Sequence, residues 1–222
     1  MLRKVLLTSA ALALVATAAN ARPNVTTSPD GRFTMVMPGK HQITQQAPIN
    51  FKKGGYLWTT LAHNAEGAYF CCYGSTISGP SSFLGKAYGA AEQFIPKSSG
   101  SIKTLAAAVG YVSGDKTVTL TLYSDNGSNS PGTALASGTG TSSTEFGFCC
   151  GVVSVSISST NLSSGTPYWV AITTGGANYN AAPFQVYDEV DDEVYLAYTS
   201  DGGTTWGSGV QETEYDPAIG VK

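Results

Sequence analysis

Short apolar segments separated by polar turn residues run along most of the chain. The clearest is Lys116–Tyr123, in which Val118, Leu120 and Leu122 alternate with threonines. Successive side chains of an extended strand point to opposite faces, so this alternation predicts a strand with one aliphatic face and one hydroxyl face. Val153–Ile157 repeats the alternation with serines. Both segments therefore predict half-buried β-strands.

Three further apolar segments, Tyr168–Thr173, Phe184–Tyr187 and Val194–Tyr198, also predict strands. Leu105–Val109 is the best helix candidate, but it is interpreted as part of a strand because no segment has a convincing helical period. Turn-forming residues separate the segments at Ser113–Asp115, Asp125–Gly127, Pro131–Gly132, Ser163–Gly165 and Asp201–Gly203. We expect residues 55–222 to form a single all-β domain, an antiparallel β-sandwich or jelly roll.

The N-terminal region has a different pattern. Residues 1–21 combine a basic start, a short apolar stretch and an Ala19-Asn20-Ala21 end, which is typical of a secretory signal peptide cleaved after Ala21. A buried N-terminal helix is the alternative. Residues 22–54 contain prolines and only brief apolar runs, which predicts a tail or linker with one short strand at Phe33–Met37. We therefore expect a secreted or periplasmic protein that is not integral to a membrane.

Charge is sparse and unevenly distributed. Only 12% of residues are charged, and without Arg3 and Lys4 the chain has 10 basic and 15 acidic residues, a net charge of −5. Between Thr117 and Val221 there is no Lys, Arg or His, but there are eleven carboxylates. Nucleic-acid binding needs clustered cations, so this distribution argues against a nucleic-acid partner.

The four cysteines form two adjacent pairs, Cys71–Cys72 and Cys149–Cys150. In an exported protein an even number of cysteines suggests disulfides. Antiparallel strands that place Cys71 opposite Cys150 also place Cys72 opposite Cys149, at a Cα separation of about 4.5–5.5 Å that a disulfide accepts. Bonds within each adjacent pair, redox chemistry and a metal site remain as alternatives. Zinc sites usually space their thiols by about two to four residues, unlike these pairs.

An acidic segment places five carboxylates within six positions. Its members are Asp188, Glu189, Asp191, Asp192 and Glu193. One hypothesis is a Ca²⁺ site, because Ca²⁺ takes several oxygen ligands in flexible geometry. The other is a solvated turn or edge strand whose like charges deter aggregation. The Asp125–Asn129 loop has too few carboxylates for a calcium loop and is interpreted as a turn.

Thr199–Trp206 resembles the Asp-box hairpin of sialidase-type propellers, in which an aspartate caps its own turn and a tryptophan packs beneath it. One copy cannot make a propeller, and the motif is structural. The resemblance implies that Asp201 caps this hairpin and that Trp206 packs under it.

Candidate catalytic chemistry is limited. His63 is the single histidine of residues 55–222, and no serine lies in a G-x-S-x-G elbow. A carboxylate-pair hydrolase remains conceivable, because a glycosidase needs only two carboxylates about 5–10 Å apart. Aromatic side chains offer the other chemistry: Tyr187, Tyr195 and Tyr198 are candidate glycan-binding residues, whereas Trp169 is assigned to the core.

The segment Phe94–Thr173 contains TLTLYSDNGSNSPGTALASG followed by SSGTPYWVAIT. These motifs resemble the choice-of-anchor R domains of secreted bacterial proteins. The resemblance implies a β-sandwich and brings no catalytic residues. Together with the composition, it leads us to expect a secreted, non-enzymatic protein that binds an extracellular ligand such as a glycan or a cell-envelope component. The alternatives are a structural envelope protein without a small ligand and a carboxylate-pair hydrolase.

Overall fold

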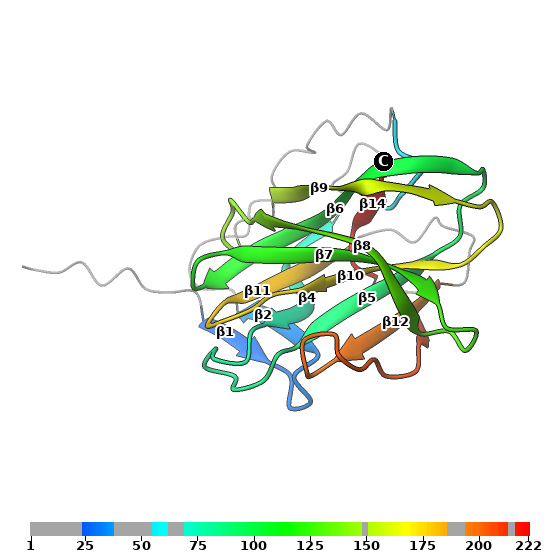
Figure 1. Ribbon diagram of the computed structural model, residues 1–222. Coiled ribbons are helices and arrows are strands. Elements are labelled where there is room, and N and C mark those ends of the chain that lie inside the picture. The colour runs from blue at the N-terminus through cyan, green and yellow to red at the C-terminus, as the bar shows by residue number, and fades with distance from the viewer. Residues whose placement is uncertain (1–23, 38–54, 62–68, 148–150, 186–193, 213–215) are drawn as a thin grey trace, which may run out of the picture.

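The computed structural model in Figure 1 describes residues 24–37, 55–61, 69–147, 151–185, 194–212 and 216–222. These residues form fourteen strands in two antiparallel sheets, with no helix among them. The predicted all-β antiparallel sandwich is therefore confirmed, while the jelly-roll connectivity stays a prediction. The described residues include no helix long and apolar enough to cross a bilayer.

The larger sheet has the order β1-β2-β4-β11-β6-β14-β3, with β9 on the other edge of β6. Its strands are β1 (Asn24–Thr27), β2 (Phe33–Met37), β3 (Trp58–Thr59), β4 (Tyr69–Ser78), β6 (Gly100–Ser113), β9 (Gly151–Leu162), β11 (Tyr179–Gln185) and β14 (Ile219–Val221). The smaller sheet has the order β13-β12-β5-β10-β7-β8. Its strands are β5 (Gly89–Phe94), β7 (Thr117–Asp125), β8 (Pro131–Thr141), β10 (Tyr168–Thr173), β12 (Val194–Thr199) and β13 (Val210–Glu212).

The main core lies between the two sheets. From the smaller sheet, β7 contributes Val118, Leu120 and Leu122, each without exposed surface, as their alternation with threonine predicts. The larger sheet contributes aliphatic side chains from β4, β6, β9 and β14. Burial of such side chains stabilises the fold by about 25 cal/mol for each Å² of apolar surface removed from water.

The central strands of both sheets are also covered on their outer faces. On β6, Leu105 and Ala107 face the main core, while Ala106 and Ala108 pack under Phe146 in a second cluster. A strand buried on both faces needs apolar residues in succession instead of alternation. This explains why Leu105–Val109 reads like a helix in the sequence but forms a strand.

The described part of the predicted N-terminal tail is not a tail. Strands β1 and β2 form a hairpin, and β2 pairs with β4, so this segment extends the larger sheet. Thr34 is fully buried, and its Oγ1 lies 2.8 Å from Thr76 Oγ1 and 2.9 Å from Tyr179 OH. The hairpin is held by these hydroxyl contacts, by backbone pairing with β4 and by packing of Phe33 against aromatic rings. A search for apolar segments misses the hydroxyl contacts. Burial raises the pKa of Tyr179, and the Thr27 and Thr34 hydroxyls partly oppose that rise.

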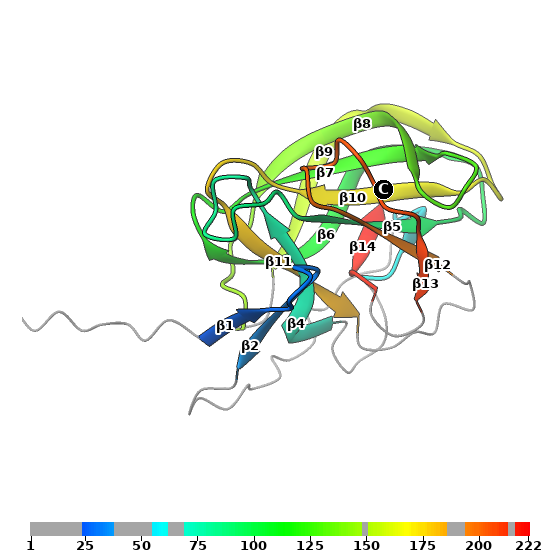
Figure 2. The same ribbon diagram turned by 90° about the horizontal axis from the view of Figure 1, so that it is seen from below.

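Strand β8 is an edge strand of the smaller sheet and β9 is an edge strand of the larger sheet. Both lie on the same side of the sandwich, close to each other (Figure 2). A Cβ added to Gly138 would lie 2.6 Å from the carbonyl oxygen of Ser156, and one added to Gly140 would lie 2.7 Å from Val153 Cγ1. Real Cβ atoms essentially never approach so closely, so the two edges meet only because β8 has glycine at both positions.

We expect Thr34→Val to destabilise the protein by about 1–2 kcal/mol, because it removes a buried hydroxyl from a bonded pair and leaves its partners unsatisfied. Urea unfolding of the two proteins measures this difference. Thr26→Val, on the exposed side of the same hairpin, is the matched control and should stay within about 0.5 kcal/mol. Equal stabilities for all three proteins would contradict the placement of the hairpin in the fold.

Gly138→Ala should destabilise the protein by about 1–3 kcal/mol, because the new methyl group meets backbone atoms of β9 that have little room to move. Gly175→Ala is the control, since a Cβ at that position has no neighbour within 4 Å. Thermal unfolding compares the two variants. An unchanged midpoint for Gly138→Ala would show that the edges of β8 and β9 are not in contact.

Candidate functional site

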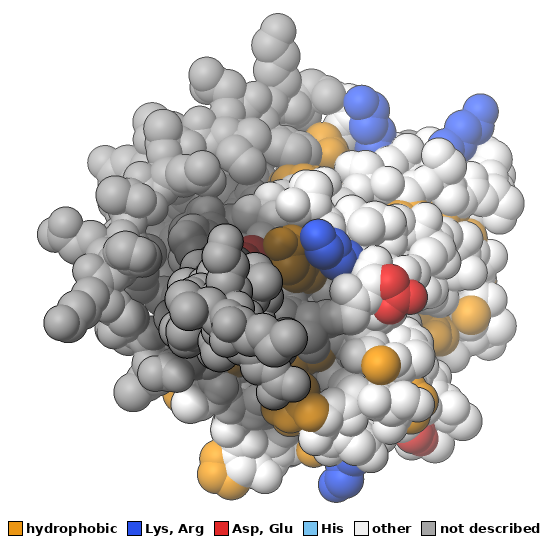
Figure 3. Space-filling model, turned by 90° about the vertical axis from the view of Figure 1, so that its left-hand side faces the viewer, with side chains coloured by type: hydrophobic (Ala, Val, Ile, Leu, Met, Phe, Trp, Pro, Cys, Tyr) orange, Lys and Arg blue, Asp and Glu red, His pale blue; other side chains and the backbone are white. Residues whose placement is uncertain are grey.

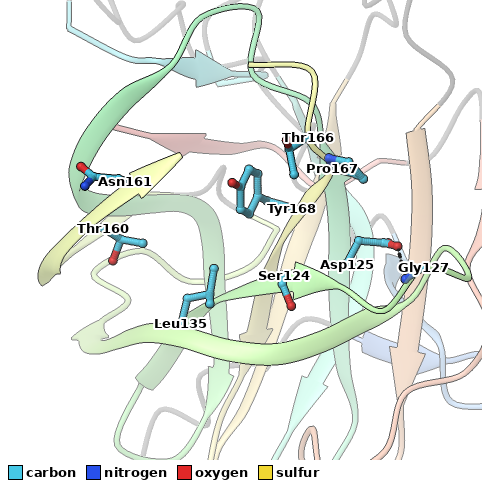
Figure 4. A pocket seen from close by; sticks show the side chains of 9 residues that line it. All are labelled: Ser124, Asp125, Gly127, Leu135, Thr160, Asn161, Thr166, Pro167 and Tyr168. Carbon is cyan, nitrogen blue, oxygen red and sulfur yellow. Dashed lines mark hydrogen bonds between the residues drawn. The ribbon is translucent and has the colours of Figure 1, made fainter. Parts of the chain in front are cut away.

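An open pocket of about 520 Å³ lies at one end of the sandwich (Figure 4). It forms where β7, β8 and β9 meet the turn before β10. The lining residues are Ser124, Asp125, Gly127, Leu135, Thr160, Asn161, Thr166, Pro167 and Tyr168. Figure 4 places the Tyr168 ring in the middle, with Asn161 on one side and Thr166 and Pro167 on the other. The pocket thus combines hydroxyl and amide groups with one aromatic ring and the apolar side chains of Leu135 and Pro167.

Asp125 shapes the loop at the rim of this pocket. Its Oδ1 accepts hydrogen bonds from Trp169 Nε1 at 2.8 Å and from Gln93 Nε2 at 3.2 Å. Its Oδ2 accepts one from the backbone N–H of Gly127 at 2.7 Å. Both oxygens are engaged in structural bonds, so Asp125 acts as a turn-forming group.

Hydrogen bonds with neighbouring residues fix some of the other polar groups of the pocket. The Tyr168 hydroxyl accepts the backbone N–H of Ser163 at 3.2 Å, and Tyr168 is only 8% exposed. Ser124 Oγ accepts the backbone N–H of Thr133 at 3.1 Å, which fixes the start of β8. Asn161 is exposed at the end of β9. The pocket lining contains no Lys, Arg or His. The polar groups of the pocket can donate hydrogen bonds to an uncharged ligand and accept hydrogen bonds from it.

The candidate glycan-binding tyrosines do not form one platform. Tyr195 packs with Trp169 on the outer face of the smaller sheet, whereas Tyr198 packs against the main core. They lie on opposite faces of β12 because they are three residues apart in a strand. Arg32 lies over the Tyr198 ring, with its guanidinium carbon 5.4 Å from the ring centroid. Tyr187 lies outside the described residues.

The Asp-box-like hairpin forms a strap, residues 200–209, that crosses the outer face of the smaller sheet (Figure 2). Asp201 accepts hydrogen bonds from the hydroxyls of Thr199 at 2.6 Å and Thr205 at 2.6 Å, and from the backbone N–H of Thr205 at 2.9 Å. These bonds lower the pKa of Asp201 from 3.8 to about 2. The predicted capping role of Asp201 therefore has its geometric basis here.

Trp206 of the strap packs toward the sheet, with its ring centroid 6.0 Å from that of Tyr123 in an edge-on arrangement. Beneath the strap, Trp169 has no exposed surface, as its assignment to a core requires. The Gly209 N–H donates to the Asn129 carbonyl at 2.8 Å, so the strap also holds the loop that borders the pocket.

Several predicted site residues lie wholly or partly outside the described residues. The acidic segment Asp188–Glu193, His63 and Cys149–Cys150 are among them, so the calcium site stays a prediction. The backbone of Cys71 and Cys72 lies in β4, which pairs with β2 and β11. Strand β9, which follows Cys149–Cys150 in the sequence, pairs with β6. The proposed disulfides also stay a prediction. Within the described ranges, no three His, Cys, Asp or Glu side chains gather to hold a metal ion.

The sequence pattern did not point to the pocket. The predictions that Asp125–Asn129 forms a turn and that Tyr168 lies in a strand are both confirmed. Thr160, Asn161 and Thr166 had no distinguishing signal. On the face seen in Figure 3, the described Lys and Arg side chains stand apart from one another instead of gathering into a basic patch.

Comparisons of the chain with protein-family models, with curated proteins and with solved structures found no match. The resemblance to choice-of-anchor R domains accordingly stays a prediction.

The pH dependence of stability provides a test of the strap. Because the pKa of Asp201 is lowered in the folded state, its bonds stabilise the protein above about pH 4 and this contribution is lost as the pH falls toward about 2. Asp201→Asn should therefore be less stable than the wild type near neutral pH, and the difference should narrow in acid. Urea unfolding monitored by tryptophan fluorescence measures it.

Two threonine variants control this experiment. Thr205→Val removes a hydroxyl that donates to the Asp201 carboxylate. This variant should therefore lose part of the pH-dependent stabilisation that Asp201→Asn loses. Thr204→Val should not, because the Thr204 hydroxyl donates to the backbone carbonyl of Asp201 instead. If the difference between wild type and Asp201→Asn were constant with pH, the capping role would be wrong.

Proposed function

We propose that this protein is an exported, non-enzymatic binding domain whose pocket at the Tyr168 end of the sandwich takes a short segment of a neutral glycan. The observation that supports this most directly is the composition of the pocket. A tyrosine ring, Leu135 and Pro167 lie among hydroxyl and amide groups, and the one carboxylate is engaged in structural hydrogen bonds. Small-ligand sites typically combine apolar surface with a few polar groups that fix orientation.

The preference for an uncharged ligand follows from the charges at the pocket. An anionic ligand would find no Lys, Arg or His in the lining. A cationic ligand would compete with Trp169, Gln93 and Gly127 for the oxygens of Asp125. A sugar needs neither, because its hydroxyls both donate and accept hydrogen bonds to groups such as Asn161 and Thr166.

The presence of one carboxylate, Asp125, in the pocket lining favours binding over hydrolysis. A glycosidase uses two carboxyl groups on opposite sides of the scissile bond, about 5–10 Å apart. The pocket lining includes Asp125 alone. Two other carboxylates, Glu92 and Asp216, are almost fully buried, and neither lines the pocket.

In this role residues 1–21 direct export, and two other parts of the chain support the domain. Disulfides between the cysteine pairs would strengthen the domain outside the cell. Calcium at the acidic segment Asp188–Glu193 would raise stability. A structural envelope protein without a ligand is the alternative that the binding experiment distinguishes.

The double variant Asn161→Ala/Thr166→Ala should weaken glycan binding by about tenfold, because it removes two sets of hydrogen-bonding groups from the pocket. Isothermal titration with neutral disaccharides and trisaccharides, first identified on a glycan array, measures the affinity. The control Ser81→Ala/Thr26→Ala changes exposed polar residues at other places on the molecule. It should bind as the wild type does.

Two results would contradict the proposal. One is the absence of binding to any neutral glycan on the array, which would favour the structural role. The other is binding that the pocket variant leaves unchanged while its folding, checked by circular dichroism, is intact.

A further inference from the structure

The outer face of the smaller sheet beside the strap has a regular row of hydroxyl groups. Strands β7 and β8 pair Thr119 with Thr139 and Thr117 with Thr141. The aliphatic residues of β7 between these threonines face the main core, so the threonines face outward. Thr119 Oγ1 and Thr139 Oγ1 lie 3.5 Å apart, which confirms that this pair shares a face.

The spacing of this row is set by the strands. Residues two apart along a strand are about 6.6–6.8 Å apart, and neighbouring strands are about 4.7–4.9 Å apart. Thr139 and Thr141 are exposed, and Thr117 and Thr119 are half-buried. The threonines therefore present a two-by-two array of hydroxyl groups to solvent.

Two aromatic side chains lie beyond the array on the same face, past the buried Thr121. Tyr123 lies farther along β7 on the same face, and Trp206 packs edge-on against it from the strap. Both residues are partly exposed, although the Nε1 atom of Trp206 is buried. Gly207 N–H donates to the Tyr198 carbonyl at 3.0 Å and holds the strap, and hence Trp206, in place. We call Tyr123, Trp206 and the four threonines the outer platform.

The outer platform has no charged side chain among its members, and it adjoins the pocket. Tyr123 faces outward, and the next two residues, Ser124 and Asp125, line the pocket. The loop after Asp125 separates the two surfaces and contacts the strap, because Asn129 accepts the N–H of Gly209 and Ser130 Oγ donates to the Gly207 carbonyl. One chain-like ligand could therefore contact both surfaces around the end of β7.

We propose that the outer platform binds further sugar units of a neutral polysaccharide whose neighbouring segment lies in the pocket. The inference rests on the proposed function, and it makes the preferred ligand a polymer instead of a short oligosaccharide. Aromatic rings pack against the apolar C–H face of a sugar ring, while the threonine hydroxyls exchange hydrogen bonds with its rim. The platform has no charged side chain, and the one carboxylate of the pocket, Asp125, is engaged in structural hydrogen bonds, which fits a neutral polymer. Both surfaces lack the cations that an acidic polysaccharide would need.

The experiment compares long and short ligands on the same variants. Affinity electrophoresis in gels containing hydroxyethyl cellulose, soluble starch or dextran measures polymer binding, with alginate as the anionic control polymer. Titration with neutral disaccharides and trisaccharides measures binding at the pocket. The platform variants are Trp206→Ala and Thr139→Val/Thr141→Val; the second retains the branched shape of each side chain and removes only the hydroxyls. Thr26→Val, on the exposed side of β1, is the matched control.

We expect both platform variants to weaken binding of the preferred neutral polymer by at least about threefold and to leave disaccharide and trisaccharide binding unchanged. The Thr26→Val control should bind all ligands as the wild type does. If Trp206→Ala unfolds, the threonine double variant alone decides the outcome.

Other outcomes separate this inference from the proposed function. Polymer binding that neither folded platform variant weakens would overturn the outer platform and leave the pocket intact. Equal weakening of polymer and trisaccharide binding would also overturn it, because the platform would then act through the pocket. Polymer binding that depends on the platform but not on Asn161 and Thr166 would support the platform and contradict the pocket. Stronger binding to alginate than to any neutral polymer would overturn both.

Discussion

Trp169 lies on the outer face of the smaller sheet and has no exposed surface, so the fold has to cover a large indole on the side of the sheet that faces away from the main core. Two features meet that requirement. The strap crosses over the indole, and Asp125 accepts the indole N–H. A buried indole N–H without an acceptor would cost about 1–3 kcal/mol, so this hydrogen bond removes that penalty from the burial of Trp169.

The same hydrogen bond determines the shape of the candidate site. Asp125 holds Trp169 with one oxygen and the Gly127 N–H with the other, so the loop beside the pocket is fixed to the core of the smaller sheet. The strap is tied to that loop through Asn129 and Ser130. The pocket and the outer platform are therefore both positioned by the packing of one tryptophan, although neither includes its side chain.

Much of the strand pattern could be predicted from the sequence, for a simple reason. Where one face of a strand is exposed, as in β7 and β9, residues alternate and the prediction is direct. The predicted strand at Phe33–Met37 coincides with β2, but its place in the larger sheet involves long-range contacts that leave no local pattern, such as those of Thr34 with Thr76 and Tyr179. Pro131–Gly132, predicted as a turn, begins β8.

The pocket was less predictable because no segment supplies it alone. Its residues come from the ends of β7, β8, β9 and β10, and their positions depend on registers that link residues far apart in the chain, such as Tyr168 with Ser124. Single exposed polar residues such as Asn161 are ordinary in sequence and become notable only beside Tyr168.

The contact between β8 and β9 has a consequence for how the protein behaves at high concentration. The last strand of a sheet usually offers unpaired N–H and C=O groups on which a strand of another molecule can assemble. Here Gly138 and Gly140 bring the edge of the smaller sheet against β9, so each edge obstructs access to the other. Neither strand contains a charged residue or an internal proline, which are the usual protections against such assembly. Protection of these two edges against such assembly thus depends on two missing side chains.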